Sequence, residues 1–60
     1  MKNYKILVID DSVDILKSMV SIIEKHHPEY HIYQSISAVA ANRILKSIRP
    51  DLIITDWEMP

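Results

Sequence analysis

The sequence contains no glycine and no cysteine among its sixty residues. Phosphate-binding loops of the P-loop and dinucleotide types need glycine for close approach of the backbone, so neither type of loop can be built here. Without cysteine there is no disulfide and no cysteine-ligated zinc site. The lack of cysteine is also compatible with a reducing cytoplasm.

Long apolar runs and an excess of charge of one sign are missing too. The longest apolar runs have about four residues, far fewer than the ~20 that span a bilayer. The N-terminus lacks the apolar segment of a signal peptide. Seven basic and eight acidic side chains give a formal net charge of −1, which provides no electrostatic basis for binding nucleic acid. We therefore expect a soluble cytoplasmic protein without membrane or nucleic-acid contacts.

The apolar pattern predicts five short elements in the order β-α-β-α-β. Strands are expected over residues 4–9, 31–36 and 52–56, and helices over 12–25 and 37–48. Pro28 and Pro50 fall between elements, where a helix has to stop. This order is typical of an α/β fold with a parallel sheet and right-handed crossovers. Sixty residues allow one domain with a thin core, and we expect no second domain.

Each predicted helix carries one apolar stripe and a polar residue that can cap its start. Asp11 or Ser12 can cap the first helix and Ser37 the second, and Asp14 suits the positive end of the first helix dipole. Residues at helical spacing form the two stripes. They are Ile15, Leu16, Met19, Ile22 and Ile23 in the first helix, and Val39, Ala40, Ile44, Leu45 and Ile48 in the second.

Acidic residues follow two of the predicted strands at the point where each strand ends. Asp10 and Asp11 close the first strand, and Asp56 closes the third. Ligand sites in parallel sheets lie at the carboxyl ends of the strands, so these carboxylates are expected to meet. Carboxylates suit Mg²⁺, which accepts a few such oxygens and keeps positions for water or phosphate. A carboxylate beside the cation could then attack a phosphoryl donor. The alternative is three surface acids at loop starts, one of them a helix cap.

Two segments resemble the receiver domain of two-component response regulators. They are Lys-Ile-Leu-Val-Ile-Asp-Asp-Ser at residues 5–12 and Arg-Pro-Asp-Leu-Ile-Ile-Thr-Asp-Trp-Glu-Met-Pro at 49–60. The resemblance runs over all sixty residues and covers the N-terminal half of a domain that usually has five strands and five helices. It implies a flavodoxin-like parallel sheet, with strand order 2-1-3 in this half.

The resemblance also implies roles for the matching residues. Asp56 would be the phospho-acceptor, and Asp10, Asp11 and Asp56 would hold Mg²⁺ together with the backbone carbonyl of Glu58. The donor would be a phosphohistidine on a sensor histidine kinase or phosphotransfer protein, or a small phosphodonor. The chain would accept a phosphoryl group on its own aspartate without being a turnover enzyme. Trp57, next to the acceptor, is expected to report metal binding by fluorescence.

Two other functions stay open from the residues alone. One is a binding or assembly module that keeps the fold without using phosphorylation. The third strand would then be an unpaired edge at Leu52, Ile53 and Ile54, a template for a symmetric homodimer. The other is a small phosphatase, which ranks last because no acid-base partner accompanies the carboxylates. A histidine metal site is disfavoured because Pro28 separates His27 from His31, so His26 and His27 are expected at a helix end.

Overall fold

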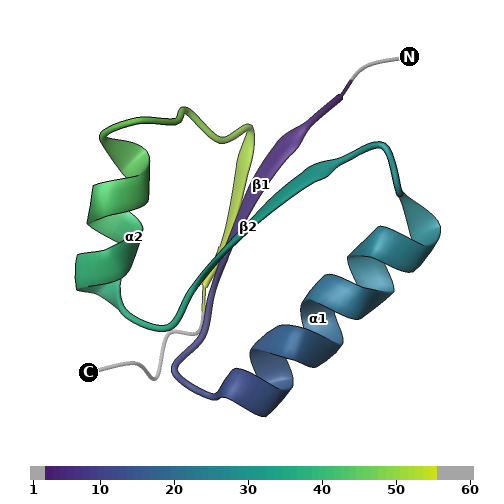
Figure 1. Ribbon diagram of the computed structural model, residues 1–60, viewed down its shortest axis with the longest axis horizontal. Coiled ribbons are helices and arrows are strands. Elements are labelled where there is room, and N and C mark those ends of the chain that lie inside the picture. The colour runs from purple at the N-terminus through teal and green to yellow at the C-terminus, as the bar shows by residue number, and fades with distance from the viewer. Residues whose placement is uncertain (1–2, 56–60) are drawn as a thin grey trace.

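A computed structural model describes residues 3–55 of the chain as a three-stranded parallel sheet with one helix on each face (Figure 1). The strand order β2-β1-β3 and the alternation of strands and helices confirm the predicted α/β, flavodoxin-like arrangement. The strands are β1 (Lys5–Ile9), β2 (His31–Ser35) and β3 (Leu52–Thr55), and the helices are α1 (Val13–His26) and α2 (Ala38–Leu45).

The central strand β1 pairs in parallel with both of its neighbours, and all three strands end level. Its last residue, Ile9, lies opposite Ser35 of β2 and Thr55 of β3. Parallel strands that end together bring their following loops to one edge of the sheet. In Figure 1 this edge is the lower end of the sheet, where α1 also begins.

Alternate residues of β1 build two separate halves of the core, because successive side chains of a strand point to opposite faces. Ile6 and Val8 pack with Leu16 and Val20 of α1. Leu7 and Ile9 pack with Ala41 of α2 on the other face. The four apolar residues of β1 are almost fully buried, as expected for a strand covered on both sides.

Each helix buries one apolar face against the sheet, as the spacing predicted, but several of the residues predicted for these faces were wrong. Val20 and Ala41 are buried although neither belonged to a predicted stripe, whereas Ile22 is 59% exposed and Val39 is 66% exposed. Each helix packs only on β1 and β2, so its buried strip is narrower than its apolar surface. Spacing alone reports the apolar surface, and the packing partner decides which part of it is covered.

Helix α2 is shorter than the predicted range of 37–48. It ends at Leu45, and the Ser47 N–H donates to the Ile44 carbonyl at 3.0 Å, a bond across three residues that tightens the last turn. The residue before a proline is pushed out of the helical region, which excludes Arg49 from the helix. The helix therefore closes in a tight turn before Pro50.

Both helix starts are capped by serine. Ser12 Oγ accepts a hydrogen bond from the Ile15 N–H at 3.5 Å, and Ser37 Oγ accepts from the Ala40 N–H at 3.1 Å. Each bond satisfies one of the backbone donors that a helix start leaves free. Ser12 is the cap of the first helix, and the alternative cap Asp11 is not.

Strand β3 is covered by neither helix. Helix α1 and helix α2 both lie against β1 and β2 alone. Leu52 is 53% exposed and Ile53 is 44% exposed, one on each face of the sheet, whereas Ile54 packs against the core on the α1 side. An open cavity of about 260 Å³ lies beside the start of β3, lined by Tyr4, Ile6, Tyr30, Asp51 and Leu52.

The start of β3 is held by a bracket with β1. The backbone N–H of Lys5 donates to the Asp51 carboxylate at 2.9 Å, and the Asp51 N–H donates back to the Lys5 carbonyl at 2.7 Å. These two bonds extend the ladder between the strands by one residue. The bracket lies at the end of the sheet opposite to Asp10 and Asp11.

Within residues 3–55, no helix combines the length and apolar character needed to cross a membrane.

Candidate functional site

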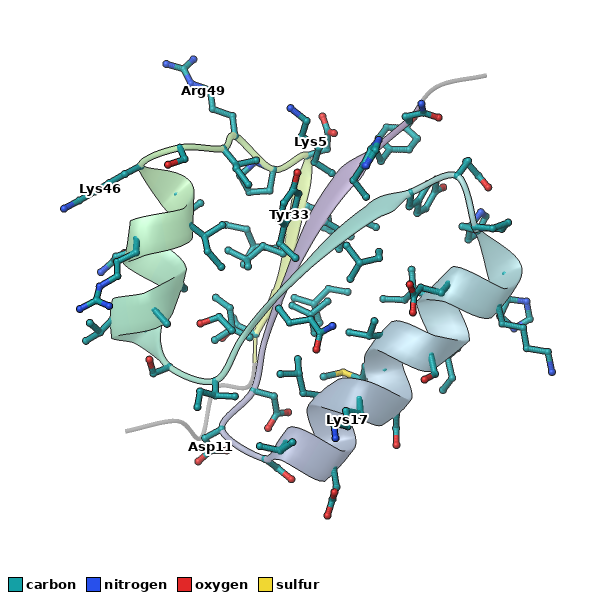
Figure 2. The ribbon with its side chains drawn as sticks, viewed as in Figure 1. Lys5, Asp11, Lys17, Tyr33, Lys46 and Arg49 are labelled. Carbon is teal, nitrogen blue, oxygen red and sulfur yellow. The ribbon has the colours of Figure 1, made fainter. Side chains whose placement is uncertain are left out.

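Asp10 and Asp11 follow β1 directly and lie at the carboxyl end of the sheet, between β1 and the start of α1. Figure 2 shows Asp11 at this end of the molecule, while Lys5 and Arg49 lie at the opposite end. The two neighbouring acids differ in surroundings, because Asp10 is only 4% exposed and Asp11 is exposed. The chain thus presents one carboxylate fixed in the structure and one reaching solvent.

Asp10 is held by its backbone and by its side chain. Its N–H donates to the carbonyl of Ser35 at 3.0 Å, which continues the β1–β2 ladder one step beyond Ile9. Its Oδ1 accepts from the N–H of Ser12 at 2.9 Å, at the first capped turn of α1. A nearly buried carboxylate needs such partners, because a buried charge without hydrogen bonds is costly. The bonds fix Asp10 where β1 meets α1.

Two serines that were not predicted as part of the site, Ser35 and Ser37, are bonded to each other, and Ser35 is also bonded to Asp10. Ser35 is 4% exposed, and its Oγ donates to the Ser37 carbonyl at 2.7 Å and accepts from the Ser37 N–H at 3.3 Å. Ser35 and Ile9 are paired across the strands. The available signal was the Ser-Ile-Ser sequence at a strand end, where a buried hydroxyl can bond back to the backbone.

Three residues of the expected site lie outside the described residues. They are Asp56, the expected acceptor, Glu58, the expected source of a carbonyl ligand, and Trp57, the expected reporter. Thr55, the last residue described, is paired with Ile9, directly before Asp10. Asp56 follows Thr55 in the sequence. The roles assigned to Asp10, Asp11, Asp56 and Glu58 stay predictions.

The donor set that the structure does describe suits a hard cation. Mg²⁺ is usually bound through one or two carboxylates and keeps several waters, and Asp10 and Asp11 supply two carboxylates at one loop. Among residues 3–55, no group of three or more histidine, aspartate or glutamate side chains is arranged to hold a metal. The described residues therefore fit a partial Mg²⁺ site of two carboxylates.

His26 and His27 lie at the end of α1, as expected. His26 lies in the last turn and His27 caps the helix. The His27 Nδ1 lies 3.4 Å from a carboxylate oxygen of Glu29, and the ring stacks on Tyr30 with centroids 4.4 Å apart. The rings of Tyr30 and Tyr4 are in turn nearly perpendicular, with centroids 5.3 Å apart. This aromatic cluster closes the connection between α1 and β2, far from Asp10.

Comparison with known proteins gives an independent view of the same chain. Residues 6–60 match the response regulator receiver domain family. Stress response regulator protein 1 of Candida tropicalis is 32% identical over 60 residues, covering the whole of this chain and 23% of that protein. Protein-glutamate methylesterase/protein-glutamine glutaminase 3 of Burkholderia thailandensis is 36% identical over 56 residues, 93% of this chain and 16% of that protein.

The chain spans less than a quarter of the length of either relative. No solved structure matches it significantly. The family match covers nearly the whole chain and includes both acid-bearing segments, and the sheet has the strand order that the resemblance implies. The chain therefore belongs to the family of response regulator receiver domains.

Proposed function

We propose that this chain is the N-terminal half of a phospho-accepting receiver domain, with Asp56 as the acceptor in two-component or phosphorelay signalling. Membership of the family supports the proposal, since receiver domains are generally phospho-acceptors. The single observation that carries it is the placement of Asp10 and Asp11 at the carboxyl end of β1, level with the end of β3 that Asp56 follows.

In the proposed site, Asp10, Asp11, Asp56 and the backbone carbonyl of Glu58 hold Mg²⁺. When bound, Mg²⁺ would offset the negative charge of the phosphoryl group and of the carboxylates around it. Asp10 contributes a carboxylate fixed by Ser12, and Asp11 contributes one that reaches solvent. This difference suits direct coordination by one acid and contact through water by the other.

The chemical step is transfer of a phosphoryl group from a phosphohistidine on a sensor histidine kinase or phosphotransfer protein. A carboxylate oxygen of Asp56 attacks the phosphorus, a P–O bond forms and the P–N bond to the donor imidazole breaks. The imidazole leaves with the electron pair of that bond and takes up a proton. Each chain is modified once, so the proposal includes no turnover. A cytoplasmic location is part of the same proposal, and the lack of cysteine is compatible with that reducing compartment.

The proposal is tested by incubating the chain with acetyl phosphate and Mg²⁺ and measuring its intact mass. We expect a gain of one phosphoryl group that disappears in Asp56→Asn. Asp51→Asn is the matched control, because Asp51 lies at the other end of the same strand and should leave the gain unchanged. A phosphoryl group retained in Asp56→Asn would contradict the assignment.

Binding of the cation is measured separately from phosphorylation. Titration with Mg²⁺ should quench the fluorescence of Trp57, the one tryptophan of the chain. The quenching should be lost in Asp10→Asn and in Asp11→Asn and kept in Asp51→Asn. Equal quenching in the unsubstituted chain and in all three variants would show that Asp10 and Asp11 do not bind Mg²⁺.

A second candidate function, assembly through β3, is favoured by the exposure of that strand. Leu52 and Ile53 are about half exposed on opposite faces, and neither helix covers β3. An uncovered strand edge pairs readily with another strand, and a second copy of this chain offers a matching one. The resulting homodimer would join two β3 strands across a twofold axis.

Sedimentation at several concentrations tests this assembly. We expect the mean mass to rise with concentration, and Ile53→Lys to keep the chain monomeric because lysine blocks edge pairing. Ile22→Lys is the control, since Ile22 is exposed on α1 and away from β3. A monomer mass independent of concentration, together with cooperative melting, would rule out the homodimer.

A further inference from the structure

The hydroxyl of Ser35 closes the turn between β2 and α2. It donates to the Ser37 carbonyl and accepts from the Ser37 N–H, so both of its hydrogen-bonding functions are used within two residues. The same Ser37 carbonyl accepts the N–H of Ala41 at 3.0 Å in the first turn of α2. Ala41 is buried against Leu7 and Ile9 of β1. The hydroxyl thus connects the end of β2 to a helix that is anchored in the core.

The backbone carbonyl of Ser35 is bonded to the proposed site, whereas its hydroxyl is bonded to the start of α2. Its carbonyl accepts the Asp10 N–H at 3.0 Å, and the Asp10 side chain is nearly buried behind this bond. Ser35 is the last residue of β2, so its backbone lies between the ladder to β1 and the turn that its hydroxyl closes. A shift of Ser35 therefore moves the backbone of Asp10, from which the carboxylate extends to the N–H of Ser12.

We propose that Ser35 is a positioning residue for the cation site, which fixes the Asp10 carboxylate through the backbone of Asp10. The inference rests on the proposed function, since it assigns Asp10 to Mg²⁺. Partners that orient a metal-binding carboxylate without touching the metal commonly change metal affinity, by about 10–100-fold when removed. Ser35 differs from the capping serines Ser12 and Ser37, because its hydroxyl bonds the backbone of the cap residue Ser37 and not a backbone N–H within a helix.

Three variants of the full chain test the assignment. Ser35→Ala removes the hydroxyl, Ser35→Thr retains it, and Ser18→Ala removes an exposed hydroxyl that donates to the Asp14 carbonyl within α1. We expect Ser35→Ala to weaken Mg²⁺ binding, measured by Trp57 fluorescence, about tenfold, while Ser35→Thr and Ser18→Ala bind as the unsubstituted chain does. Far-UV circular dichroism establishes that each variant is folded.

Hydrogen exchange of the Asp10 amide, measured by NMR without Mg²⁺, gives a readout that does not depend on metal. Its exchange should be about tenfold faster in Ser35→Ala than in the unsubstituted chain, and unchanged in Ser35→Thr, because a loosened turn opens the Asp10–Ser35 bond locally. A change spread evenly over all core amides would instead mean general destabilisation, and would overturn the assignment.

The outcomes separate this inference from the proposed function. If the unsubstituted chain does not bind Mg²⁺, the proposed site fails, and Ser35 loses its role toward the metal whatever the amide shows. If it binds Mg²⁺ and Ser35→Ala binds equally well while folded, the proposed site stands and the assignment of Ser35 falls. If Ser35→Ala does not fold, Ser35→Cys under reducing conditions replaces it, since a thiol has similar size but is too weak a donor and acceptor to hold the turn as the hydroxyl does. Unchanged Mg²⁺ affinity in that variant would equally overturn the assignment.

Discussion

Asp51 shows how one exposed acid can stabilise a sheet. Its carboxylate accepts the Lys5 N–H and its own N–H donates to the Lys5 carbonyl, so a single residue continues the β1–β3 ladder with two bonds. In the sequence, Asp51 stands out only as part of the motif shared with receiver domains. Because a carboxylate 46 positions away along the chain accepts the Lys5 N–H, no local pattern could have revealed it.

We expect Asp51→Ala to lower the free energy of unfolding by about 1 kcal/mol, the usual net contribution of one hydrogen bond. Asp51→Asn keeps an acceptor of the same shape and should lose less than half as much. Urea denaturation followed by circular dichroism measures both. Equal losses in the two variants would show that charge, and not the bond to Lys5, is responsible.

Asp10 and Asp11, the two acids of the site, also differ as single residues. Both were predicted from their position after the first strand, and both lie at its carboxyl end. Which acid is fixed was not predictable, because the Ser35 carbonyl that accepts the Asp10 N–H comes from β2, a separate element of the sheet. A sequence pattern reports that acids stand together, and only the packing decides which one is fixed.

At the scale of elements, the two helix caps offer a matched comparison. The bond at Ser37 is shorter, 3.1 Å, than the bond at Ser12, 3.5 Å. Ser37 is also bonded through its backbone to Ser35, so this start of α2 is held twice.

We therefore expect Ser37→Ala to cost about 1 kcal/mol of unfolding free energy, with a smaller loss for Ser12→Ala. Ser37→Asp should restore most of the loss, because aspartate is also a good cap. Thermal melting of the three variants compares them directly. A larger loss at Ser12 than at Ser37 would contradict the ranking by bond length.

All five elements could be predicted from the sequence. Apart from the end of α2, their boundaries within residues 3–55 differ from the predicted ones by one residue at most, and the predicted strand end at Asp56 lies outside the described residues. Strand alternation and helical spacing are local properties of the sequence, so they are enough to predict the elements and their approximate bounds. The buried positions Val20 and Ala41 were missed because burial depends on where β1 and β2 lie beneath each helix. The edge position of the third strand predicted exposed side chains at Leu52, Ile53 and Ile54. The first two are exposed, whereas Ile54 packs against the core on the α1 side.

At the scale of the whole molecule, cation binding and stability are linked. A ligand that binds only the folded chain adds stability as its concentration rises above its dissociation constant. In a chain of this size, each kcal/mol moves the melting temperature by several degrees.

If Asp10 and Asp11 hold Mg²⁺, then Mg²⁺ at a hundred times its dissociation constant should raise the melting temperature by about 10–20 °C. Differential scanning calorimetry measures the shift, with KCl at equal ionic strength as the control. Asp10→Asn should melt at the same temperature with either salt. A rise of the same size in KCl would mean charge screening in place of binding.

The bracket between Lys5 and Asp51 also bears on how fast the chain folds. It joins residues 46 positions apart in a chain of sixty. Contacts of such long range are slow to form, because the entropy of closing the loop is lost before the contact is gained. We expect α1 and the β1–β2 pair to form before β3 docks. The bracket would then be absent from the folding transition state, and weakening it should accelerate unfolding while leaving the folding rate nearly unchanged.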